Sequence, residues 1–260
     1  MQGGTPIEGH VKRVAAITSA LAGLAALAVF LTPAGATSER LACGSGTHGS
    51  AGYAYAGLQS GRVGSGVRAT ITAFRQPAVA AGHAAGWIGV GGPGAGPNGE
   101  TMWLQTGIAA LPGMPLMVYA EITRPGRAPS FMPLRQDVAV GESHRLAVLE
   151  MSRRPGVWRV WLDDKPVTEP IVLPGSHRQW EPLATAESWN GGTATCNGFG
   201  FRFERVGLAR ALGGSWQTFV PGYTFRDRGY AVRQLSPSPR GQRTLSAGSP
   251  AAYAFDALSA

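Results

Sequence analysis

Short stretches of alternating apolar and polar residues recur along the middle of the chain. Residues 68–74 alternate cleanly, and residues 198–206 place Phe199, Phe201 and Phe203 on one face of an extended segment. A period of two residues is typical of strands that bury one face. Residues 44–209 carry no helical periodicity with capping residues. The pattern therefore predicts an all-β domain over residues 53–210, built as a sandwich or a barrel.

One hairpin is predicted with a defined turn. Residues 157–162 have the composition of a strand, and Asp163 and Asp164 follow them directly. Adjacent turn-forming residues between two extended segments favour a tight hairpin. Residues 144–151 are the expected antiparallel partner of this strand.

The pattern weakens toward the C-terminus. Residues 211–235 keep several apolar positions and are predicted to form appended strands or a hairpin. Proline, serine, glycine, arginine and alanine dominate residues 236–260. A segment of that composition buries too little apolar surface to order itself, so a disordered tail is predicted.

The first 36 residues have the features of a secretory signal peptide. Lys12 and Arg13 precede an uncharged, mostly apolar run over residues 14–31, and small residues at 34–36 offer a cleavage site. The alternative is a retained membrane anchor, because the run approaches the length needed to span a bilayer. The expectation is a secreted or extracellular protein whose mature chain begins with a short segment, residues 37–52.

Export would place the two cysteines in an oxidising compartment. Cys43 and Cys196 are the only cysteines, and an oxidising compartment allows a disulfide between them. Two buried free thiols are the alternative. Neither cysteine has histidine or cysteine neighbours at the spacing of a zinc site, so no metal is predicted.

The formal net charge is +8, and loss of residues 1–36 would leave +7. A basic exported protein could associate with anionic cell-surface polymers or membranes. Nucleic-acid binding is not expected, because the arginines are scattered and no basic run is interleaved with stacking aromatic residues.

The candidate chemistry comes from carboxylates and an amide. No serine lies in a Gly-x-Ser-x-Gly elbow, and the five histidines are isolated in the sequence. Gln105, by contrast, interrupts a strand-like run and is followed at once by what is interpreted as a glycine-bearing turn at Gly107. A side-chain amide at such a position could donate a hydrogen bond to a developing oxyanion.

These residues carry a resemblance to a known family. Residues 86–92 (Gly-Trp-Ile-Gly-Val-Gly-Gly) and 104–108 (Leu-Gln-Thr-Gly-Ile) resemble the core signature of the glutamic peptidases, or eqolisins. Residues 119–122 are similar to an aromatic-rich strand of that family, and residues 184–189 to its strand with the catalytic glutamate. The resemblance spans residues 53–206. It implies a concanavalin-like β-sandwich of two antiparallel sheets. Gly91 stands where the family has an aspartate.

The resemblance also implies roles for individual residues. Glu187 would be the general base that activates water and then the acid that protonates the leaving amine. Gln105 would hold the water and stabilise the oxyanion. It further implies an acid endopeptidase that acts on polypeptides as a monomer, without metal or organic cofactor. The residues expected around the substrate are Trp103, Trp189, Glu121 and Tyr119, with a mainly structural role for Glu121.

Strand parity agrees with such a site. In extended segments Gln105 shares a face with Trp103, and Glu187 shares a face with Trp189. Trp87 is interpreted as a core residue. A lectin-like or cell-wall-binding module remains the competing hypothesis, because fold does not decide function. A structural secreted protein without a ligand groove is a third possibility.

Overall fold

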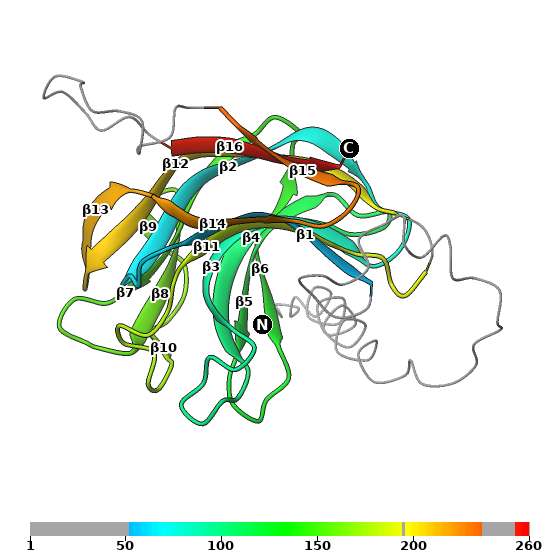
Figure 1. The fold of residues 1–260 in the computed structure, drawn as a ribbon. Coiled ribbons are helices and arrows are strands. Elements are labelled where there is room, and N and C mark those ends of the chain that lie inside the picture. The colour runs from blue at the N-terminus through cyan, green and yellow to red at the C-terminus, as the bar shows by residue number, and fades with distance from the viewer. Residues whose placement is uncertain (1–51, 194–195, 236–252, 260) are drawn as a thin grey trace, which may run out of the picture. The chain divides into compact units, whose positions relative to one another are not determined.

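The computed structural model describes residues 52–193, 196–235 and 253–259. The regular elements of this part of the chain are strands, β1 to β16, and it contains no helix long and apolar enough to cross a membrane. The strands form two antiparallel sheets that lie against each other (Figure 1). The prediction of an all-β sandwich of two antiparallel sheets is confirmed.

The first sheet has seven strands in the order β14-β1-β11-β3-β4-β5-β6. Its strands are β1 (Tyr53–Ser60), β3 (His83–Gly92), β4 (Met102–Ala110), β5 (Leu116–Thr123), β6 (Ser130–Val138), β11 (Leu183–Trp189) and β14 (Pro221–Arg226). Strands β3 to β6 follow one another as a meander. Strand β11 enters between β1 and β3, which brings the 184–189 segment beside the Trp-Ile-Gly segment.

The second sheet has nine strands, with β10-β8-β7-β2-β12-β16-β15 in line, β13 paired with β12 and β9 paired with β8. Its strands are β2 (Gly66–Ala78), β7 (Ser143–Glu150), β8 (Val157–Leu162), β9 (Lys165–Pro166), β10 (Ile171–Val172), β12 (Gly198–Ala211), β13 (Gly214–Thr218), β15 (Tyr230–Gln234) and β16 (Tyr253–Ser259). The longest strands, β2 and β12, pair at its centre.

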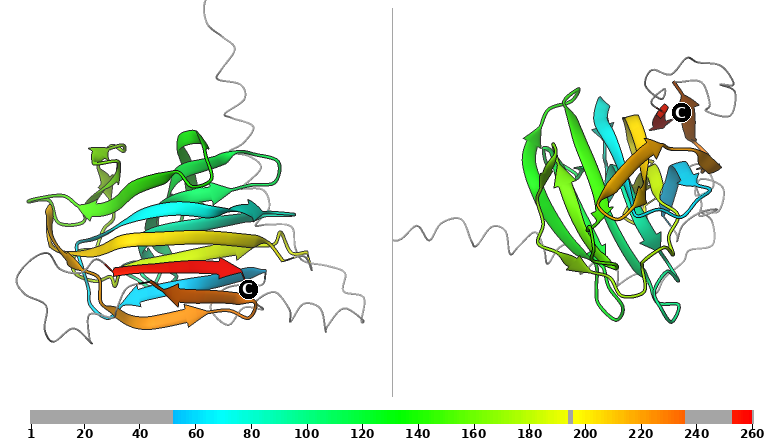
Figure 2. Two further views of the ribbon diagram at one scale, coloured as in Figure 1. Left: turned by 90° about the horizontal axis from the view of Figure 1, so that it is seen from above. Right: turned by 90° about the vertical axis from the view of Figure 1, so that its left-hand side faces the viewer.

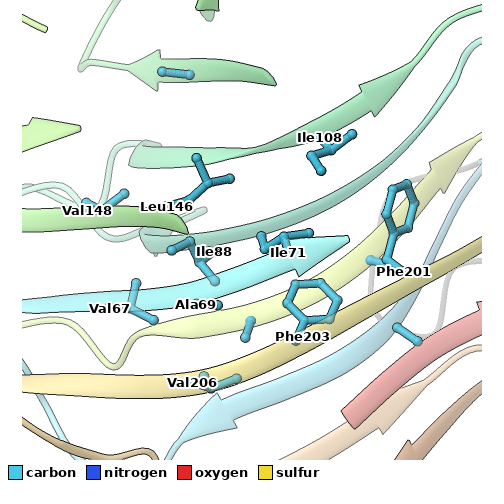
Figure 3. Close-up of a cluster of buried hydrophobic side chains, with 14 of the residues drawn as sticks. Val67, Ala69, Ile71, Ile88, Ile108, Leu146, Val148, Phe201, Phe203 and Val206 are labelled. Carbon is cyan, nitrogen blue, oxygen red and sulfur yellow. The ribbon is translucent and has the colours of Figure 1, made fainter. Parts of the chain in front are cut away.

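The core lies between the two sheets. Ile71 and Phe203 from the nine-stranded sheet and Ile88 and Ile108 from the seven-stranded sheet are fully buried there (Figure 3). Each such side chain contributes about 1.5–3 kcal/mol on burial. Because neighbouring residues of a strand point to opposite faces, the intervening residues of β4 and β11 face away from this core.

The predicted hairpin is confirmed. Strand β7 pairs with β8, and Leu162 pairs with Lys165 across a two-residue turn. Asp163 and Asp164 both have positive φ angles, 49° and 65°. Two such residues in a two-residue loop form the type I′ turn that matches the twist of the flanking strands.

Residues 211–235 form strands, as predicted, but these strands are part of the sandwich and are not appended to it. Strand β13 pairs with β12, β14 pairs with β1, and β15 pairs with β16, so the segment contributes to both sheets. The sandwich therefore extends well past residue 210. The local pattern indicated strands correctly but could not show their distant partners.

The prediction of a disordered tail is wrong for Tyr253–Ser259. This segment is β16, which lies between β12 and β15 (Figure 2). Its alternate residues Tyr253, Phe255 and Ala257 are buried, and Asp256 between them is an ion-pair partner of two arginines on neighbouring strands. A composition averaged over 25 residues concealed one short strand. The rest of the predicted tail, residues 236–252 and 260, lies outside the described residues.

Three other predictions also concern residues outside the described part of the chain. They are the signal peptide at 1–36, the short segment that follows it, and Cys43 as a disulfide partner. Cys196 is described, and no free cysteine is found among the described residues. The pairing of Cys43 with Cys196 stays a prediction.

Candidate active site

A groove of about 510 Å³ lies on the face of the seven-stranded sheet that points away from the core. Its lining combines aromatic rings, amides and two carboxylates, including Tyr53, Tyr55, Trp87, Trp103, Gln105, Glu121, Glu187, Tyr223 and Phe225. Within the described part of the chain, its lining includes no lysine or arginine. A basic protein thus presents a groove lined by two glutamates and one histidine.

Gln105 is fixed near the middle of the sheet on β4. Its side chain is buried, and Nε2 donates a hydrogen bond to the hydroxyl oxygen of Tyr119 at 3.2 Å. Tyr119 is itself buried, stacks on Phe131 with ring centroids 5.0 Å apart, and accepts a hydrogen bond from Thr106 on its backbone oxygen. A primary amide carries two N–H groups. One holds the side chain in place and the second can bind another oxygen.

Two glycines make room for this arrangement. A Cβ on Gly89 would lie 2.9 Å from the Cβ of Gln105 on the neighbouring strand. A Cβ on Gly107 would lie 2.6 Å from the Cβ of Trp87 and 2.2 Å from the backbone oxygen of Gly86. Gly107 therefore lies within β4 and not in a turn, which corrects the sequence interpretation. The two glycine-bearing motifs are adjacent because each glycine accommodates the neighbouring strand.

Glu187 is held on β11 by partners that the sequence analysis missed. Its Oε1 lies 3.2 Å from Nε2 of His83, and its side chain hydrogen-bonds that of Tyr55. Burial and then the charge of Glu187 raise the pKa of Tyr55 above its usual value, so the phenol stays protonated and can donate to the carboxylate. Glu187 is 8% exposed. It is a buried carboxylate with an imidazole and a phenol as neighbours.

Rings fix the position of the imidazole. Tyr53 contacts His83 edge-on at a centroid distance of 6.0 Å, and Trp189 contacts it at 5.9 Å. Tyr53 and Trp189 also stack on each other. Trp189 was expected beside the substrate; the structure places it against His83, next to Glu187.

Glu121 is a second carboxyl in the same groove. It is half-buried on β5 and pairs directly with Gln105 on β4. Burial, and secondarily the charge of Glu187, raise its pKa to about 7, while His83 and Trp103 have smaller opposite effects. Below neutral pH, Glu121 therefore keeps its proton. The structure places it directly opposite Gln105 in the groove, whereas a mainly structural role was expected for it.

The strand register sets the relation between Gln105 and Glu187. Strand β3 lies between them; Gly89 pairs with Gln105 and with Leu183, four residues before Glu187 on β11. On a flat sheet this offset amounts to about 13 Å along the strands and about 10 Å across them. Both side chains leave the same face and line the same groove. Because of this offset, the ends of the Gln105 and Glu187 side chains do not contact each other, and part of the groove lies between them.

The tryptophans divide between the two faces. Trp103 lines the groove, as the strand parity predicted. Trp87 also lines it, in a small cluster with Tyr119 on that face, so its assignment to the sandwich core is wrong. Trp180 belongs to the core, where it stacks on Trp158.

His83 is isolated in the sequence, and neither Tyr53 nor Tyr55 was predicted to lie in the site. His83 is 104 residues from Glu187, and only the pairing of β3 with β11 brings them together. The alternation of Tyr53 and Tyr55 at the start of β1 was the available signal, because it places both rings on one face. The described residues contain no group of three histidine, cysteine, aspartate or glutamate side chains arranged to hold a metal ion.

The sequence matches no protein-family model and no curated protein. Among solved structures, the chain is similar to scytalido-glutamic peptidase with a peptide-based transition state analog, at 12% identity, covering 80% of this chain and 98% of that one, with a TM-score of 0.48. It is also similar to SCP-B, a member of the eqolisin family in complex with the tripeptide Ala-Ile-His, at 12% identity, the same coverage and a TM-score of 0.43. Bacillus licheniformis β-glucanase is 16% identical over 50% of this chain and 55% of that one, with a TM-score of 0.33. Similarities this distant assign no residue a role.

Proposed function

We propose that the groove hydrolyses peptide bonds, as an exported glutamic-type endopeptidase would, with Glu187 and Gln105 as its catalytic pair. The observation that supports this most is that both side chains line one groove on one face of one sheet. The Leu-Gln-Thr-Gly motif and its resemblance to the eqolisins add to it. The expected substrate is a polypeptide.

Glu187 is proposed to act as the general base. Its carboxylate would take a proton from a water molecule that attacks the peptide carbonyl carbon. The His83 ring at 3.2 Å and the Tyr55 hydroxyl hold the carboxylate in one orientation. A base restrained in this way loses little entropy when the substrate binds, which favours the attack.

Gln105 is proposed to stabilise the oxyanion. Its amide is already oriented by Tyr119 and has a second N–H for the carbonyl oxygen. A preorganised donor of this kind typically accelerates acyl transfer by about 10²–10³-fold. The space between Gln105 and Glu187 would hold the scissile peptide group and the attacking water.

The test is digestion of a denatured protein at acid pH, followed by mass spectrometry of the products. The purified protein is expected to release new peptides, while Gln105→Ala and Glu187→Gln release few or none. Gln179→Ala and Glu204→Gln are the matched controls, because both residues are exposed and lie outside the groove. Equal digestion by all five proteins would rule out the proposed roles.

A carbohydrate-binding groove is the second candidate. Tyr53, Trp103 and Tyr223 offer ring faces, and Gln59, Gln105 and the two glutamates offer polar contacts. Sugars are commonly bound by such a combination of flat apolar surface and hydrogen-bonding groups. Calorimetric titration with soluble cell-wall oligosaccharides, together with no peptide release in the digestion, would favour this candidate.

Export and association with anionic cell-surface polymers complete the proposal. The first rests on residues 1–36 and the second on the net charge of +7 that would remain after their removal. Salt-dependent release of the protein from intact cells would test the association, because electrostatic binding weakens as ionic strength rises.

A further inference from the structure

We propose that Glu121 is a second catalytic carboxyl of the groove, and that it donates the proton to the leaving amine. This inference rests on the proposed function and divides its proton transfers between two residues. Glu187 then acts as the base, and it does not have to reach both the attacking water and the departing nitrogen.

The first support is the pairing of β4 with β5. Gln105 and Glu121 are directly opposite each other, and both line the groove. Directly opposed residues of an antiparallel pair have Cβ atoms about 4.5–5.5 Å apart. An oxygen bound by the Gln105 amide is therefore close to the Glu121 carboxyl. The nitrogen of a peptide group is bonded to the same carbon as that oxygen, so it falls within reach of Glu121.

The second support is the position of Glu187. It lies two strands from Gln105 and is offset by four residues along the sheet, beside His83. A water activated by Glu187 would approach the carbonyl carbon from the β11 side of the groove. The leaving nitrogen would lie on the β4–β5 side of the groove, close to the Glu121 carboxyl.

The third support is the protonation of the groove. Burial and the charge of Glu187 raise the pKa of Glu121 to about 7, so Glu121 is protonated at acid pH. The other titratable groups that line the groove or interact with its carboxyls are His83, Tyr53, Tyr55, Tyr119 and Tyr223. Burial and the two glutamates raise the pKa values of Tyr53 and Tyr119 above their usual range. These two phenols, and that of Tyr55, therefore stay protonated and do not compete as bases.

The proton balance closes within one turnover. The water oxygen forms a bond to the carbonyl carbon while its proton passes to Glu187, and the π electrons of the carbonyl move onto its oxygen, the oxyanion bound by Gln105, until they re-form the carbonyl as the amine leaves. The carbon–nitrogen bond then breaks as Glu121 gives its proton to the nitrogen, which leaves as an amine. Glu187 is left protonated and Glu121 ionised. Exchange of one proton with solvent on each carboxyl restores the starting state, and no oxidant or co-reactant is consumed.

The experiment compares two substrates that differ in their leaving group. A peptide amide needs a proton on its nitrogen before it can leave, whereas a p-nitrophenyl ester of the same acyl peptide releases a stable phenolate. Glu121→Gln is expected to lower kcat for the amide by about 10²-fold or more, which is typical of losing a general acid. It is expected to lower ester hydrolysis by less than about threefold. Glu187→Gln is expected to abolish both reactions, because both need the activated water.

The pH profile is the second readout. Amide hydrolysis by the unaltered protein is expected to fall as the pH rises through about 7, where Glu121 loses its proton. Glu121→Asp keeps a carboxyl at this position, so it is expected to recover part of the amide hydrolysis lost in Glu121→Gln and to show a similar fall as the pH rises. Thermal melting of each variant separates misfolding from loss of chemistry, and Glu204→Gln is the matched control.

The outcomes distinguish the two proposals. Equal loss of amide and ester hydrolysis in Glu121→Gln, or no loss of either, would overturn the role of Glu121 and leave the peptidase proposal intact. An unaltered protein that cleaves neither substrate would overturn both. Carboxyl titration by carbon NMR gives a check without catalysis, because a Glu121 signal that titrates near 4 would also contradict the assignment.

Discussion

Two histidine–carboxylate clusters lie on opposite sheets of this sandwich, and their surroundings give them opposite properties. In the groove, His83 contacts Glu187, and Glu121 lies on the same face. On the nine-stranded sheet, buried His144 lies 3.0 Å from Asp163 and 3.3 Å from Glu142. Each cluster combines one imidazole with two carboxylates. Each cluster also lines a pocket, of about 510 Å³ at the groove and about 640 Å³ around His144.

Hydrogen-bond donors make the difference. Around His144, Arg135 pairs with Glu142 at 2.6 Å, and the backbone amide of Arg145 donates to Asp163. Burial alone would raise the pKa of Asp163, but that amide and His144 outweigh it, and the pKa lies below its usual value. In the groove, aromatic rings take the place of such donors around Glu121, and burial raises its pKa to about 7. A carboxyl surrounded by donors stays ionised, whereas a carboxyl surrounded by rings keeps its proton.

The largest expected effect contrasts the two clusters in activity. Glu187→Gln removes the proposed base and is expected to lower kcat/KM for a peptide amide by about 10³-fold or more. Glu142→Gln alters a carboxylate of the other cluster and is expected to change kcat/KM for the same peptide amide by less than twofold. Initial rates on a fluorogenic peptide at acid pH measure both. Comparable losses in the two variants would remove the functional distinction between the clusters.

The pH dependence of stability should have opposite signs in the two clusters. Between pH 4.5 and about 7 the folded protein holds a proton on Glu121 that the unfolded chain releases, so the free energy of unfolding falls as pH rises, by on the order of 3 kcal/mol. Asp163 contributes stability above its unfolded pKa and loses it as the pH falls through its lower folded value.

Denaturant unfolding between pH 2 and pH 8 checks these signs. Glu121→Gln should flatten the slope above pH 4.5, and Asp163→Asn should flatten the slope at the acid end. If Glu121→Gln flattened the acid slope and Asp163→Asn the slope above pH 4.5, or if neither slope changed, the pKa values of the two carboxyls would not be shifted in opposite directions.

Strand packing beneath the groove gives a smaller effect. Gly107→Ala introduces a methyl group 2.2 Å from the backbone oxygen of Gly86, and is expected to cost about 1–3 kcal/mol of unfolding free energy and to displace Trp87. Gly198→Ala in β12 is the matched control, because its added Cβ would meet only ordinary contacts at 3.5 and 3.6 Å. Urea denaturation compares them, and equal midpoints would contradict the close approach of β3 to β4.

The smallest effect is expected at the surface of the His144 cluster. Arg135→Gln removes a partly exposed ion pair with Glu142, and such pairs typically contribute about 0–1 kcal/mol. The melting temperature should shift by a few degrees at most, with peptide hydrolysis unchanged. A large loss of activity would mean that the His144 cluster takes part in the function of the groove.

The sequence was sufficient for the strand character and for the faces of individual strands. The two-residue period placed Phe199, Phe201 and Phe203 in the core, and parity placed Gln105 with Trp103 on the groove face. These features depend on neighbours within a few residues. The same local logic identified the Asp163–Asp164 turn.

The sequence was insufficient wherever a property depends on strand order. The contact of His83 with Glu187 requires β11 to enter beside β3, and the pairing of Gln105 with Glu121 depends on the register of β4 and β5. Strand β16 is ordered by its neighbours β12 and β15, which no local composition reveals. The raised pKa of Glu121 follows from burial and from a residue 66 positions away, so it could not be predicted from the sequence.

The most direct test of the central claim is a double-mutant cycle on Gln105 and Glu187, measured as kcat/KM for one peptide amide. The two residues lie two strands apart, and the claim is that they serve one reaction. Groups that act as a unit are strongly non-additive. Gln105→Ala combined with Glu187→Gln is therefore expected to be no slower than the slower single variant. A double variant whose loss equals the product of the two single losses, or single variants that retain full activity, would contradict it.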